Sequence, residues 1–152
     1  MSAAATSSGN QELSLDTLSL EQLDSLKTQL ENEIRQFTGS FQGLKEAQAR
    51  FTGSGNVLTT LTPETEGKSI FVPLTPSMYI PGKLCDTSHV LVDVGTGYYV
   101  EKDVKDAKAF MDRKVSFLQQ NLDSLQDLID TKRTNFEMVM GVMQQRLSQK
   151  KQ

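Results

Sequence analysis

Apolar residues recur at heptad spacing in the first third of the chain. The positions are three or four residues apart, with one extra step of four, and Gln48 is the one polar member of the following series: Leu23, Leu26, Leu30, Ile34, Phe37, Phe41, Leu44, Gln48 and Phe51. Such steps predict an amphipathic helix with one apolar stripe, and the extra step is a stutter that a coiled coil tolerates. We expect this helix over residues 13–61, with Ser14 or Ser19 as its cap, since Ser19 and Gln22 have the spacing of a capping box.

A second heptad pattern follows the last proline and is more regular. Its steps are three and four residues, with one stutter near the start, and Lys132 is its one polar position. The predicted seam positions are Val104, Ala107, Met111, Val115, Leu118, Leu122, Leu125, Ile129, Lys132, Phe136, Val139, Met143 and Leu147. A helix of that length spans about 60 Å, and its stripe needs a partner. We therefore expect a helix over residues 103–148, packed antiparallel on the first as a coiled coil. We also expect a disordered N-terminal tail over residues 1–12 and a C-terminal tail over residues 149–152. The glycines Gly53 and Gly55 predict an end or a kink in the first helix.

The segment between the two patterns, residues 62–102, contains all 4 prolines of the chain. Its apolar residues alternate, which predicts short strands on either side of tight turns. Pro81 and Gly82 suit the central positions of a type II turn, and Gly95-Thr96-Gly97 is typical of a hairpin turn. We expect two β-hairpins here, and hence an α+β fold in which a long antiparallel coiled coil is joined by these hairpins.

The glycines of the second hairpin also invite comparison with nucleotide-binding loops. The dinucleotide fingerprint requires a third glycine, and Val100 stands in its place. A Walker loop requires a glycine five residues before Gly67-Lys68-Ser69, and Thr62 stands there. The hairpin interpretation is therefore favoured, and we expect no nucleotide and no other cofactor.

Composition and single residues narrow the function further. The 16 basic and 19 acidic residues are spread along the chain, which argues against a nucleic-acid ligand. No apolar run approaches the ~20 residues of a membrane span. The start of the chain also lacks the features of a signal peptide. We therefore expect the protein to be located in the cytosol, with the nucleus as a second location. Cys85 and His89 have the spacing of metal ligands, but the chain has no second Cys or His to complete a metal site. We therefore expect Cys85 to be buried and His89 to lie at the surface or at a sheet edge. We also expect no enzyme activity.

Two features indicate binding to other proteins. Short hairpins leave strand edges and apolar faces uncovered, which predicts completion by strands of neighbouring subunits. Met138, Met140 and Met143 lie near the end of the second helix, opposite leucines at the start of the first. One interpretation is that Met143 fills the seam with the others on its flanks. The other is that these methionines form a surface that accepts many partners.

The central strings VPLTPSMYIPGKL (Val72 to Leu84) and HVLVDVGTGYYVEK (His89 to Lys102) resemble those of eukaryotic alpha-class subunits of the prefoldin family. The resemblance extends over nearly the whole chain from about Leu18. It implies a hetero-hexamer of two alpha-class and four beta-class subunits, whose hairpins join into inter-subunit β-barrels. It also implies capture of unfolded polypeptides, notably actin and tubulin, and their delivery to the cytosolic group II chaperonin without nucleotide.

The resemblance assigns roles to two sets of residues. The oligomerisation hairpins would be formed by Ile70, Val72, Leu74, Val90, Val92, Val94, Gly95, Gly97, Tyr98 and Val100. Clients would touch the ends of the coiled coil at Leu13, Leu15, Leu18, Leu20, Leu23, Met138, Met140, Met143 and Leu147. The alternative is a structural tether, in which the coiled coil docks one fixed partner.

Overall fold

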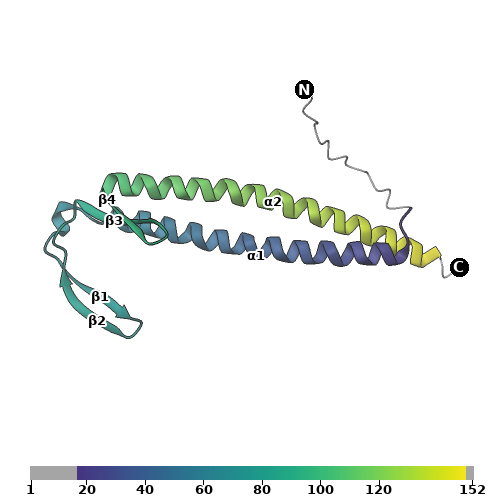
Figure 1. Cartoon of the computed structure of the whole chain (residues 1–152), viewed down its shortest axis with the longest axis horizontal. Coiled ribbons are helices and arrows are strands. Elements are labelled where there is room, and N and C mark those ends of the chain that lie inside the picture. The colour runs from purple at the N-terminus through teal and green to yellow at the C-terminus, as the bar shows by residue number, and fades with distance from the viewer. Residues whose placement is uncertain (1–16, 150–152) are drawn as a thin grey trace, which may run out of the picture. The chain divides into compact units, whose positions relative to one another are not determined.

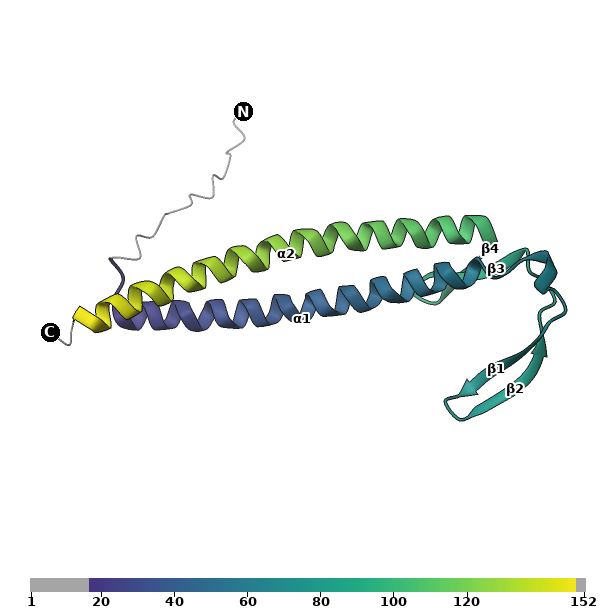
Figure 2. The same ribbon diagram turned by 180° about the vertical axis from the view of Figure 1, so that it is seen from behind.

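The computed structural model describes residues 17–149 of the chain. These residues form two compact units. The helical unit consists of the described residues up to Gly39 and those from Gln126 onward, and the hairpin unit is Ser40–Leu125. Within each unit, a segment of α1 (Leu20–Leu58) lies beside an antiparallel segment of α2 (Val104–Gln149), as Figures 1 and 2 show. The predicted helix pair is thus confirmed.

The start of α1 is set by a capping box at Ser19. The Ser19 N–H donates to Gln22 Oε1 at 2.8 Å, and the Gln22 N–H donates to Ser19 Oγ at 3.2 Å. These bonds satisfy two main-chain donors that the first turn leaves without an intrahelical partner. We expected the helix to start at residue 13, but residues 17–19 lie before its first turn, and residues 13–16 lie outside the described residues.

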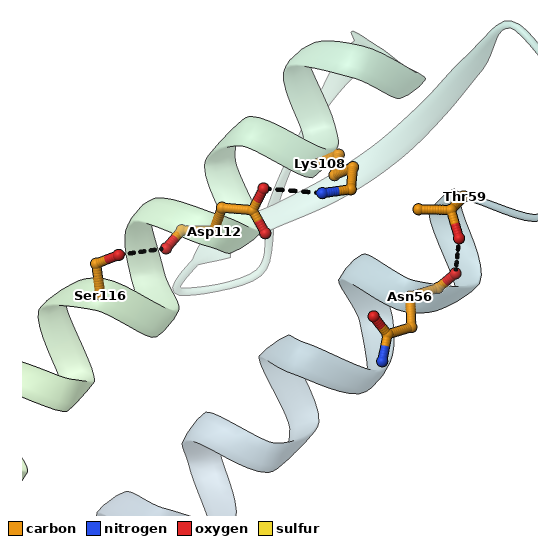
Figure 3. A network of polar contacts seen from close by, with 5 residues as sticks. All are labelled: Asn56, Thr59, Lys108, Asp112 and Ser116. Carbon is orange, nitrogen blue, oxygen red and sulfur yellow. Dashed lines mark hydrogen bonds and ion pairs between the residues drawn. The ribbon is translucent and has the colours of Figure 1, made fainter.

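Near its C-terminus, α1 passes through Gly53 and Gly55 and ends at Leu58, so the expectation that these glycines end it is wrong. Gly55 is buried, and a Cβ there would lie 3.6 Å from Met111 Cβ of α2. A small residue therefore lets the two helices approach closely at this point. The helix ends where the Thr59 hydroxyl donates to the Asn56 carbonyl (Figure 3). The Thr59 N–H donates to the same carbonyl.

Both predicted hairpins are present. The first pairs β1 (Ser69–Thr75) with β2 (Met78–Lys83), and the second pairs β3 (His89–Gly95) with β4 (Tyr98–Asp103). Between β3 and β4 the chain turns at Thr96 and Gly97, whose φ angles of 53° and 80° are those of a type I′ turn. The Gly-Thr-Gly sequence therefore forms a hairpin turn.

The turn predicted at Pro81-Gly82 is wrong. Both residues lie inside β2, opposite Phe71 and Ile70, and the chain turns instead between the paired residues Thr75 and Met78. Pro-Gly suits a turn locally, but a proline is also accepted in a strand whose N–H side faces outward. In a two-stranded sheet every strand has such a side.

The apolar stripes of the two helices meet in a seam. In the helical unit, Leu23, Leu30 and Val139 form a buried cluster, and in the hairpin unit Val92 of β3 packs with Leu58 and Ala107 of the two helices. The predicted seam positions that are buried across both units are Leu23, Leu30, Ala107, Leu118, Leu122, Ile129 and Val139. The predicted α+β class is confirmed.

Lys132, the polar seam position of α2, is matched by an acid on α1. Its Nζ lies 2.7 Å from Oε2 of Glu33, whose Oε1 accepts a hydrogen bond of 2.9 Å from Gln29. The Lys132 ammonium and the Gln29 amide hold the pKa of Glu33 below its ordinary value. A polar pair inside an apolar seam favours the one register in which its members meet.

Candidate functional site

The β1–β2 hairpin exposes apolar side chains on both of its faces. Ile70, Val72 and Leu74, predicted from alternation, are exposed, and so are residues on the opposite face that the prediction missed. Phe71 is the most exposed of these, at 76%. The missed signal was that the residues between the alternating ones are also apolar or aromatic: Phe71, Pro73, Tyr79 and Pro81. A two-stranded hairpin with two apolar faces is at best marginally stable in water, so this arrangement calls for a partner.

The β3–β4 hairpin has one face held by its own helices. Val92 is only 3% exposed, and Val90 packs beside it against the cluster of Leu58 and Ala107. Val92 is therefore not available to another chain, which corrects its assignment to the oligomerisation surface. The exposed predicted residues are Val94, Tyr98 and Val100, and the exposed residues that the prediction missed are Leu91 and Tyr99. Gly95 and Gly97 serve the turn, with positive φ.

At the end of the helical unit, some of the predicted client-binding residues are buried and others are accessible to solvent. Leu23 is fully buried in the seam, so its assignment to a binding surface is wrong as long as the helices stay paired. Leu18 packs against the same cluster and Leu20 is partly buried. Leu13 and Leu15 lie outside the described residues.

The three methionines near the end of α2 also differ in their exposure to solvent. Met138, Met140 and Leu147 are exposed, whereas Met143 packs against the cluster of Leu23, Leu30 and Val139. This is the arrangement of the first interpretation above, in which Met143 fills the seam. The exposed methionines still provide flexible apolar surface of the kind that accepts varied partners.

A polar contact closes this end of the helix pair. Nη1 of Arg146, near the end of α2, donates to the main-chain carbonyl of Leu18, which precedes α1. Beside it lies a hollow of about 670 Å³, lined by Ser19, Leu20, Glu21, Arg146 and Gln149. Its lining is polar and apolar in about equal parts, and the exposed large apolar side chains at this end are those of α2.

Cys85 and His89 do not form a metal site in the structure. His89 Nδ1 lies 3.1 Å from Asp86 Oδ2, and the Ser88 N–H donates to Asp86 Oδ1 at 2.6 Å. The hydrogen bond from Ser88, with that from His89, lowers the pKa of Asp86. Cys85 is exposed, so the expected burial is wrong. Among residues 17–149 there is no group of three or more His, Cys, Asp or Glu placed to hold a metal ion.

A family of known proteins matches almost all of the described residues. The family described as "Prefoldin subunit" matches residues 19–149. The chain belongs to the prefoldin family. This family is one of co-chaperones that act in protein folding rather than of known enzymes. None of the helices among the described residues has the length and apolar character needed to cross a membrane.

The prefoldin relatives cover most of the chain. It is 42% identical to "Prefoldin subunit 5" of Homo sapiens over 139 residues, which are 91% of this chain and 90% of the human protein. It is 40% identical to "Probable prefoldin subunit 5" of Dictyostelium discoideum, over 93% of this chain and 88% of that protein. The fold is also that of filamentous prefoldin from Methanocaldococcus jannaschii, with a TM-score of 0.69 and 19% identity, over 78% of this chain and 98% of that chain.

Proposed function

We propose that this chain is an alpha-class subunit of a cytoplasmic prefoldin hetero-hexamer, which captures unfolded polypeptides and passes them to the group II chaperonin without using nucleotide. Nascent actin and tubulin are the proposed clients. The hexamer would contain two alpha-class and four beta-class subunits, with hairpins joined into β-barrels. The observation that carries the proposal is exposed apolar surface in two separate places, on the hairpins and on the end of the helical unit.

The hairpins suit assembly because their exposed side chains belong to regular, paired strands. Each hairpin is a two-stranded sheet with no further strand beside it among residues 17–149. Strands from other subunits would cover both the unpaired edges and the apolar faces. The names of the human and Dictyostelium relatives both contain the word subunit, which supports an assembly.

The end of the helical unit suits client capture because it exposes a small number of apolar side chains, two of which belong to flexible methionines. Met138, Met140 and Leu147 are at least about two fifths exposed, so they can touch an apolar segment without unpairing the helices. Each contact would be weak, and several subunits that act together would supply the grip. Weak, multiple contacts also allow release to a chaperonin.

The test measures how well hexamers suppress aggregation when the exposed apolar residues at the end of the helical unit are substituted. Met138, Met140 and Leu147 are replaced together by Ser, and Met143 is left unchanged because it packs in the seam. Hexamers with this chain should suppress light scattering of diluted, denatured actin at least about threefold less well, as expected if three weak apolar contacts are lost. The matched control is Phe117→Ser, which removes an exposed apolar residue of α2 from the hairpin unit.

Equal suppression by the triple variant and the wild-type hexamer would show that clients bind elsewhere. A tether for one fixed partner, the alternative function, predicts a different result. It would bind a single saturable partner and would not protect diverse denatured proteins.

A further inference from the structure

The two sides of the seam in the helical unit differ in the charges that border them. Successive residues of an α-helix are turned by about 100°, so Glu33 and Arg35 lie on opposite sides of the seam position Ile34. On the first side, Glu33 Oε2 lies 2.7 Å from Nζ of Lys132 across the seam. Opposite charges commonly pair in this way beside the seam of a coiled coil. An ion pair therefore closes this side.

On the other side, two bases border the seam. Arg35 of α1 and Arg133 of α2 are both exposed, and both line a hollow of about 480 Å³. Neither guanidinium group forms an ion pair with an acid among residues 17–149. Two like charges beside one hollow repel each other. An anion bound between them would remove this repulsion.

Glu31 of α1 also lines the hollow, but its carboxylate is directed to another base. Its Oε1 lies 3.7 Å from Nζ of Lys27, four residues earlier on the same helix. Glu31 and Arg35 have the same spacing of four residues, which would allow an ion pair, and yet they do not form one. The two guanidinium groups therefore keep their capacity to bind an anion from another molecule.

The walls of the hollow are apolar. Ile34 and Phe136 line it and are both partly buried, and Phe136 packs against the buried seam cluster. An apolar side chain in the hollow would contact these two residues. A carboxylate beside that side chain would reach the arginines, since a guanidinium group binds a carboxylate through two parallel hydrogen bonds. The hollow thus suits an acidic group and an apolar group that are close neighbours.

The hollow lies away from the exposed apolar residues at the end of the helical unit. At 1.5 Å per residue, Arg35 is about 22 Å along α1 from Leu20, and Arg133 is about 21 Å along α2 from Leu147. An extended polypeptide covers about 3.4 Å per residue. A segment of about seven residues would therefore reach from Leu147 to the hollow, so one bound chain can use both places.

The charges around the hollow favour a polypeptide over a nucleic acid. A nucleic-acid site presents a stripe of bases to a row of phosphates. Here Asp130 and Glu137 lie about one turn before and after Arg133 on α2, and Glu31 lines the hollow itself. These acids would repel a polyanion, whereas a single carboxylate needs only the two arginines.

We propose that Arg35 and Arg133 bind a carboxylate side chain of an unfolded polypeptide, and that a neighbouring apolar side chain of the same segment packs on Ile34 and Phe136. This binding rests on the client capture proposed above. It adds a preference for segments in which acidic and apolar residues are neighbours, which the exposed apolar residues at the end of the helical unit do not supply.

Photo-cross-linking within the assembled hexamer tests the site on this subunit alone. The change Thr38→p-benzoylphenylalanine places a photo-reactive group at an exposed position of α1, one turn after Ile34 and Arg35. The probes are two short unstructured peptides. In one, glutamates alternate with leucines and phenylalanines, and in the other each glutamate is a glutamine. The glutamate peptide should give about fivefold more cross-linked product, as expected for two exposed ion pairs.

Substitution of both arginines should abolish this preference. Arg35→Gln with Arg133→Gln should bring the yields of the two peptides within about 1.5-fold of each other, because only the ion pairs distinguish the peptides. The matched control is Arg50→Gln with Arg113→Gln, which replaces one exposed arginine of each helix in the hairpin unit and should keep the fivefold preference. Equal yields with the wild-type arginines, or an unchanged preference without them, would overturn the proposal.

Charge reversal separates binding from a structural role. Arg35→Glu with Arg133→Glu should favour a third peptide, with lysine in place of each glutamate, over the glutamate peptide. An equal loss of cross-linking with all three peptides would indicate a structural role of the arginines and would contradict the proposal. Displacement of the glutamate peptide by an equal concentration of single-stranded RNA would assign the hollow to nucleic acid and would also contradict it.

Failure of the proposed client capture has a different result. Hexamers with the wild-type chain would then not suppress the aggregation of denatured actin, whatever the yields with the peptides. Hexamers that suppress aggregation but cross-link equally to the glutamate and glutamine peptides would contradict the role of the two arginines alone.

Discussion

In the helical unit, Leu23, Leu30 and Val139 are no more than 5% exposed, whereas Phe71 in the β1–β2 hairpin is 76% exposed. Both regions are rich in large apolar side chains, and both are regular structures with well-paired main chains. They differ in what covers those side chains. The seam is covered by the other helix of the same chain, and the faces of the hairpin are left without cover among the described residues.

The difference follows from the geometry of the two elements. An amphipathic helix has one apolar stripe, so one antiparallel partner can bury it completely. A two-stranded hairpin with apolar residues at consecutive positions has two apolar faces and two open edges. The chain can therefore complete its helix pair alone but cannot complete this hairpin, which is why we assign stability to the seam and assembly to the hairpins.

The seam should give the largest effect when it is broken. Leu23→Ala removes a fully buried side chain and leaves a cavity, so it should reduce the free energy of unfolding by about 2–5 kcal/mol. Urea denaturation followed by circular dichroism measures this. The control is Met138→Ala, an exposed position of the same unit, which should stay within about 0.5 kcal/mol. Equal effects of the two changes would mean that the seam does not hold the helices together.

A smaller effect is expected where a strand meets the helices. Val92→Ala removes a side chain that is 3% exposed, and it should reduce the free energy of unfolding of the isolated chain by about 1.5–3 kcal/mol. Phe71→Ala, in the other hairpin, should change it by less than about 0.5 kcal/mol but should reduce incorporation into the hexamer. Thermal unfolding and competitive assembly give the two values. A destabilised isolated Phe71→Ala chain would show that Phe71 is buried within its own subunit.

The smallest effect concerns the polar pair in the seam. Because the pKa of Glu33 is lowered below 4.5 by Lys132 and Gln29, its carboxylate stabilises the folded chain at pH values above 4.5. This contribution is lost as the pH falls through the lowered pKa. Glu33→Gln removes it, at a cost of less than about 1 kcal/mol at pH 7 for a partly exposed pair. The difference in unfolding free energy between wild type and variant should therefore shrink toward acid pH, and a difference that does not change from pH 7 to pH 3 would exclude this role.

Much of the fold could be predicted because it depends on local patterns. Steps of three and four residues identified the helices and most buried seam positions, the Ser-x-x-Gln spacing identified the cap at Ser19, and Gly-Thr-Gly identified the second turn. The prediction at Pro81-Gly82 failed because turn propensity does not include strand register. The outward N position of Pro81 makes it acceptable inside β2, and the register depends on the turn between Thr75 and Met78.

The candidate surfaces were harder to predict, because they depend on which apolar residues the chain itself buries. Leu23 and Val92 have the same sequence pattern as their exposed neighbours and are buried only because a helix packs on each. Gly55, expected to interrupt α1, is tolerated because α2 approaches closely there. Cys85, expected in the core, lies outside regular structure between the hairpins and is exposed. The burial or exposure of these residues could be predicted only from the tertiary contacts.

We expect other prefoldin-family subunits to complete the hairpins of this chain. Native mass spectrometry of the tagged chain, purified from its own cells, should show a hetero-hexamer of small coiled-coil subunits with this chain in one copy. A homodimer, or a complex with one large fixed partner, would show that the hairpins are not completed in this way and would favour a structural tether.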